Sequence, residues 1–113
     1  MTSPITTHVL DTHLGKAAAN VPVSLWRQNG QEWILLASGA TDEDGRNRSL
    51  LSPSDFSNGV YQIRFDTKSY HDAQGVEGFY PEAVICFYVK DASQHYHVPL
   101  LISPFAYSTY RGT

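Results

Sequence analysis

The chain has 113 residues, the usual size of a single domain with one hydrophobic core, and we expect residues 1–113 to fold as one unit. Its formal net charge of -3 leaves no basic surplus to neutralise phosphates, so no nucleic-acid partner is expected. No apolar run approaches the ~18 residues of a membrane span, and a lone cysteine, Cys86, excludes an internal disulfide and a thiolate metal cluster. Only 17% of the residues are charged, and the chain contains seven tyrosines. This composition favours a protein that buries part of its surface against other subunits.

Short apolar runs broken by Gly, Asn, Asp and Pro are typical of an all-β sandwich. Asn29-Gly30 predicts a tight hairpin turn, and the polar stretch 41–45 predicts another turn. Residues 67–74 are expected to form one short helix that ends at Gly75. The pattern therefore predicts a sandwich of seven to eight strands with one short helix. The strands are expected near 5–12, 21–28, 32–39, 59–66, 83–90, 95–102 and 105–111.

Two strand-like runs differ in how their apolar residues are spaced. In 60–66 apolar and polar residues alternate, which predicts one buried and one wet face. The run 83–89 is apolar at every position, so both of its faces are expected to be covered. It is either a central strand beneath a loop or helix, or part of a subunit interface. Cys86 lies in the middle of this run, which predicts a buried, inert thiol.

Three of the five histidines lie in or beside strand-like runs. Two-residue periodicity places His8 on the face opposite Val9, where a hydrogen-bonded surface histidine is the ordinary alternative to a functional one. In the run 95–102, His95 and His97 share the face opposite the apparent core. A His-x-His pair can form half of a metal site, but no third ligand lies at a recognisable spacing. We therefore expect no metal.

Arg46 follows the polar turn directly. It is either a solvated surface charge or a residue whose guanidinium donates paired hydrogen bonds to a carbonyl, a carboxylate or a urate-like oxyanion. Arg48 could compete for that role. No Gly-x-Ser-x-Gly elbow and no phosphate-cradling glycine loop is present, which argues against a serine hydrolase and against nucleotide binding.

Three blocks together are more specific than any one of these residues. The first block comprises residues 8–11 and 15–18, and the second comprises residues 41–46. The third comprises residues 95–104 together with the C-terminal sequence Tyr-Arg-Gly-Thr at 110–113. On these blocks the chain resembles the 5-hydroxyisourate hydrolases of the transthyretin-like family over nearly its whole length. It departs from the family pattern at Ala17, where Pro is usual, and at Thr113, where Ser is usual.

The resemblance implies a transthyretin-like sandwich that assembles as a homotetramer, a dimer of dimers with active sites in a channel between subunits. The implied reaction opens the N1–C6 amide-like bond of 5-hydroxyisourate in urate breakdown, with no metal or organic cofactor. The family's catalytic residues fall on His8, Arg46 and His97. The tail completes the substrate-binding pocket with Tyr110, Arg111, Gly112 and Thr113.

The resemblance also supplies a competing function, because transthyretin itself uses this fold to carry small hydrophobic ligands without hydrolysing them. A third alternative is an immunoglobulin-like interaction domain with neither activity nor a tetramer. The first residues do not have the basic region followed by an apolar region that is typical of a secretory signal peptide, and the last three residues are not the peroxisomal signal Ser-Lys-Leu. A cytoplasmic location is therefore expected.

Overall fold

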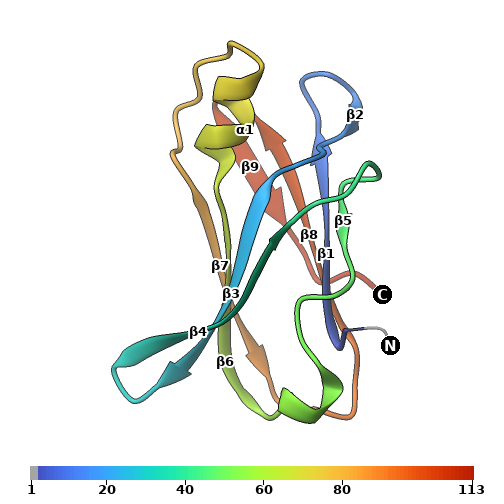
Figure 1. Ribbon diagram of the computed structural model, residues 1–113, viewed down its shortest axis with the longest axis vertical. Helices are drawn as coiled ribbons and strands as arrows, with labels where there is room; N and C mark the ends of the chain where they lie inside the picture. The colour runs from blue at the N-terminus through green and yellow to red at the C-terminus, as the bar shows by residue number, and fades with distance from the viewer. Residues whose placement is uncertain (1–2) are drawn as a thin grey trace.

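The computed structural model describes residues 3–113, which form two β-sheets packed face to face (Figure 1). One sheet has the strand order β2-β1-β8-β9, with β5 also paired to β1, and the other has the order β4-β3-β6-β7. The predicted sandwich is confirmed. The elements are β1 (Ile5–Asp11), β2 (Lys16–Ala17), β3 (Pro22–Asn29), β4 (Glu32–Ala40), β5 (Arg46–Asn47), a 3-10 turn (Pro53–Asp55), β6 (Gly59–Phe65), α1 (Thr67–Ala73), β7 (Ala83–Val89), β8 (Tyr96–Ser103) and β9 (Ala106–Thr109).

The seven longer strands lie within two residues of their predicted ends, whereas β2 and β5 were not predicted. These two strands have only two residues each, which is too short for an alternating pattern to be recognised in the sequence. The hairpin at Gly30 and the turn at Gly45 are also confirmed, and both glycines have positive φ values of 65° and 78°. Among residues 3–113, no helix is long and apolar enough to cross a membrane.

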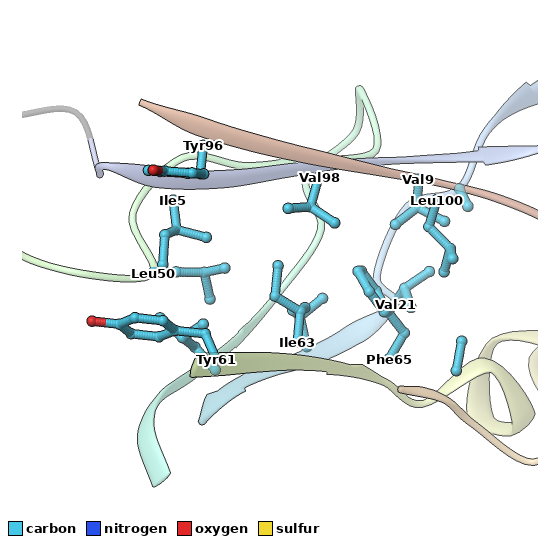
Figure 2. Close-up of a cluster of buried hydrophobic side chains, with 14 of the residues drawn as sticks. Ile5, Val9, Val21, Leu50, Tyr61, Ile63, Phe65, Tyr96, Val98 and Leu100 are labelled. Carbon is cyan, nitrogen blue, oxygen red and sulfur yellow. The ribbon is translucent and has the colours of Figure 1, made fainter. Parts of the chain in front are cut away.

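The core lies between the sheets and is built by alternate residues of facing strands (Figure 2). Each such side chain contributes about 1.5–3 kcal/mol when it is fully buried. Because successive strand residues point to opposite faces, the residues between them on β1 and β8 project from the outer face of their sheet. The core residues labelled in Figure 2 include Ile5 and Val9 on β1, Tyr96, Val98 and Leu100 on β8, and, from the facing sheet, Tyr61, Ile63 and Phe65 on β6.

The predicted helix is present as α1, and it starts at an N-cap. The Asp66 carboxylate accepts a hydrogen bond from the backbone N–H of Ser69 at 3.0 Å, and Gly75 follows the helix with a φ of 69°. The hydroxyl of Tyr70 donates to a carboxylate oxygen of Asp11 at 2.7 Å, which ties the helix to the end of β1.

Strand β7 corrects two of the sequence predictions. It is an edge strand of its sheet, so the interpretation as a covered central strand is wrong. Its outward residues are open in the single chain, with Val84 37% and Tyr88 67% exposed. Cys86 lies on the same outward face and is exposed, so the predicted burial of its thiol is also wrong. An apolar run in the sequence shows that both faces of a strand are hydrophobic, but it does not show which part of the protein covers each face.

Candidate functional site

Strand pairing brings the candidate residues together on the outer face of one sheet. Strand β1 lies between β5 and β8, with His8 opposite Arg46 on one side. On the other side β1 and β8 run parallel, and Thr6 lies opposite His97. The register therefore gathers side chains that lie up to 91 positions apart in the sequence.

The turn before β5 fixes the position of Arg46. The Asp42 carboxylate accepts hydrogen bonds from the backbone N–H groups of Asp44 and Arg46, at 2.9 and 3.0 Å. Gly45 passes so close to β1 that a Cβ there would lie 2.4 Å from the carbonyl oxygen of Val9. Glycine is therefore required at this position for the turn to deliver Arg46 to the sheet.

A pocket of about 400 Å³ opens on this face. None of its lining side chains is a carboxylate, whereas two are guanidinium groups and two are imidazoles. Arg48, the predicted competitor of Arg46, lines the same pocket. The chemistry of this lining suits a ligand rich in carbonyl oxygens or carrying negative charge. The lining residues are Thr6, Thr7, Arg46, Arg48, His95, His97 and Thr113.

His97 is half-buried in this lining, and its Nδ1 lies 2.8 Å from the hydroxyl oxygen of Thr6. Burial lowers the pKa of His97 below its ordinary value of 6.5, and the positive charge of Arg46 and the nearby His8 and His95 lower it further. The imidazole is therefore neutral at neutral pH and can accept a proton.

His8 lies beside this pocket. Its Nε2 is 2.9 Å from the carbonyl oxygen of Asp44. A carbonyl only accepts, so Nε2 carries the hydrogen and Nδ1 keeps the lone pair when the ring is neutral. His8 is thereby held by the same turn that positions Arg46.

The tail divides between two places. Gly112 donates its backbone N–H to the carbonyl oxygen of His97 at 2.8 Å, and Thr113 reaches the pocket. Tyr110 and Arg111 instead line a separate groove beside β7. There the Arg111 guanidinium lies 4.5 Å from the ring centre of Tyr96 and donates to the carbonyl oxygen of His95 at 3.3 Å. Within one chain, therefore, Gly112 lies against the imidazole of His97 and Thr113 lines the pocket, whereas Tyr110 and Arg111 line the other groove.

The His-x-His pair gains no third metal ligand, since no cluster of three or more metal-ligating side chains occurs among residues 3–113. Instead, the hydroxyl of Thr6 lies 2.8 Å from both His95 Nε2 and His97 Nδ1. Thr6 was missed by sequence reasoning, although the periodicity that places His8 on the outer face places Thr6 there too. The parallel pairing of β1 with β8 is what makes it important, and no local pattern encodes that pairing.

Comparisons with known proteins identify the family of this chain. Residues 5–112 match the family model described as the HIUase/Transthyretin family. The chain is 43% identical to 5-hydroxyisourate hydrolase of Mus musculus, covering 98% of this chain and 96% of that protein. It is 44% identical to 5-hydroxyisourate hydrolase of Halalkalibacterium halodurans, with all of both chains covered. The crystal structure of sea bream transthyretin in complex with thyroxine superposes with a TM-score of 0.93 at 32% identity, covering 98% of this chain and 96% of that one. The chain belongs to the HIUase/Transthyretin family.

Proposed function

We propose that this protein is a 5-hydroxyisourate hydrolase that adds water across the N1–C6 amide-like bond of its substrate. The product is 2-oxo-4-hydroxy-4-carboxy-5-ureidoimidazoline. The observation that carries the proposal is the convergence of a neutral imidazole, His97, and a guanidinium, Arg46, on one pocket. Relatives named 5-hydroxyisourate hydrolase, which match this chain over nearly its full length, support the same substrate.

His97 is the general base in this mechanism. Its Nε2 has no hydrogen-bond partner among the described residues, while its Nδ1 is held by Thr6. A water molecule at Nε2 gives up a proton as its oxygen bonds to the C6 carbonyl carbon, and the same proton can then pass to N1 as the C6–N1 bond breaks. His8 lies beside this path and assists the transfer of the proton.

Arg46 stabilises the oxyanion that develops on the C6 carbonyl oxygen. A fixed guanidinium aimed at developing charge is typically worth a factor of about 100 to 1000 in rate. The turn at Asp42 holds the backbone of Arg46 before substrate arrives, so little reorganisation is needed during the reaction. Thr113 lines the pocket from the tail, and on this proposal it contacts the substrate ring.

On this proposal the chain works as a homotetramer with its sites at subunit interfaces. Support comes from the apolar side chains that the single chain leaves open around β7 and the tail, including Tyr88 at 67% and Tyr110 at 59% exposed. Association through this region would cover the outward face of β7 and bring Tyr110 and Arg111 toward a neighbouring copy. Sedimentation should therefore show a tetramer, and a stable monomer would contradict this part of the proposal.

The function is tested by following the absorbance of 5-hydroxyisourate generated by urate oxidase. We expect the purified protein to accelerate its loss, and His97→Ala and Arg46→Ala to slow the catalysed reaction by a factor of about 100 or more. His13→Ala, which replaces an exposed histidine in the loop after β1, is the matched control and should keep the full rate. If the protein binds the compound without accelerating its decay, the carrier function is correct instead.

A further inference from the structure

The hydroxyl of Thr6 bridges two histidines, and this bridge constrains where their protons lie. Thr6 is 4% exposed, and its oxygen lies 2.8 Å from both His95 Nε2 and His97 Nδ1. A hydroxyl has one hydrogen to donate, and each neutral imidazole has one protonated and one unprotonated nitrogen. The tautomers of the two histidines are therefore coupled through this single hydroxyl.

Two arrangements use the hydroxyl hydrogen within this bridge. In the first, Thr6 donates to His95 Nε2 and accepts from His97 Nδ1–H, which leaves the lone pair of His97 on Nε2. In the second, Thr6 donates to His97 Nδ1 and accepts from His95 Nε2–H, which leaves a hydrogen on His97 Nε2. Only the first arrangement presents a base at Nε2.

The first arrangement also survives the proton transfer unchanged. When His97 Nε2 takes a proton, the imidazolium donates from both nitrogens, so Nδ1–H must point at the Thr6 oxygen. The hydroxyl then still donates to His95 Nε2, and no bond in the bridge reverses. Starting from the second arrangement, the hydroxyl would have to rotate and His95 would have to give up its Nε2 hydrogen.

We propose that Thr6 and His95 are positioning residues which hold His97 in the Nδ1–H tautomer, with its Nε2 lone pair facing the pocket. His95 also lines the pocket, and in this arrangement it takes no proton from water but supplies the acceptor that directs the Thr6 hydroxyl. This role rests on the proposed function in so far as His97 is the base. The tautomer itself is a property of the free protein and can be measured without substrate.

The test is long-range ¹H–¹⁵N NMR of the imidazoles of the free protein at pH 8, where His97 is neutral. We expect the wild type to show hydrogen on His97 Nδ1 and none on Nε2. Thr6→Val removes the hydroxyl and should distribute the hydrogen over both nitrogens, whereas Thr6→Ser should restore the wild-type spectrum. His95→Ala removes the acceptor and should shift His97 toward the Nε2–H tautomer. A wild-type protein with hydrogen on Nε2, or a Thr6→Val spectrum like that of the wild type, would overturn the proposal.

Kinetics provide the second readout. Thr6→Val and His95→Ala should lower kcat about tenfold, the equivalent of about 1.4 kcal/mol, with little change in KM, and Thr6→Ser should recover most of the rate. Thr67→Val is the matched control, because Thr67 is equally buried and its hydroxyl donates to the carbonyl oxygen of Tyr80 outside the site. This control should lose stability but keep kcat and the His97 tautomer. A full kcat in Thr6→Val would refute the positioning role, whereas an inactive wild type with the Nδ1–H tautomer would count against the proposed function alone.

Discussion

Gly112 permits the tail to lie directly against the imidazole of His97. A Cβ at this position would lie 2.6 Å from His97 Cδ2, whereas ordinary contacts begin near 3.4 Å. In Gly112→Ala the ring and the tail must therefore separate by about 0.8 Å. The backbone cannot relax freely, because the N–H of Gly112 is hydrogen-bonded to the carbonyl oxygen of His97 at 2.8 Å. The substitution thus moves either the base or the closing residue Thr113.

A misplacement of about 1 Å can cost roughly a factor of 100 in rate. We therefore expect Gly112→Ala to lower kcat/KM about 100-fold, or by about 2.7 kcal/mol, in the 5-hydroxyisourate absorbance assay. The fold should persist, since the position lies in the tail beyond β9, and thermal unfolding checks this. Gly59→Ala is the control, because its added Cβ would meet the flexible end of Arg27 at 3.2 Å, outside the site. A folded Gly112→Ala protein with the full rate would refute the reasoning.

Three further predictions concern pH and stability. Because burial and then the charge of Arg46 lower the pKa of His97, its neutral form persists to lower pH, and the acid limb of kcat/KM should have its midpoint below pH 6.5 in steady-state rates. For Asp11, burial alone would raise the pKa, but hydrogen bonds led by the Tyr70 hydroxyl outweigh it and lower the pKa. Its stabilising contribution is therefore present above the unfolded pKa of about 3.9 and is lost as pH falls through the folded pKa, so Asp11→Asn should lower the urea midpoint much more at pH 7 than near pH 3. Ile63→Ala should cost about 2–5 kcal/mol in urea unfolding, because Ile63 is fully buried between the sheets.

The sequence alone determined the sandwich, its turns and the inward face of most strands. Periodicity is a local property, so the alternation of Tyr61 and Ile63 predicts burial without knowledge of neighbouring strands. The same rule placed His8 and His97 on outer faces, and the structure agrees. The motif blocks also identified the family, because they combine residues that an ordinary sandwich does not need.

The tertiary structure decided which of these outward residues meet. The parallel pairing of β1 with β8 places Thr6 opposite His97, and the pairing with β5 places His8 opposite Arg46. The tertiary structure also places β7 at the edge of its sheet, with Cys86 exposed on its outward face. The physical reason is that pairing partners are selected by long-range closure of the two sheets, whereas the same apolar pattern fits a central strand, an edge strand and a subunit interface equally well.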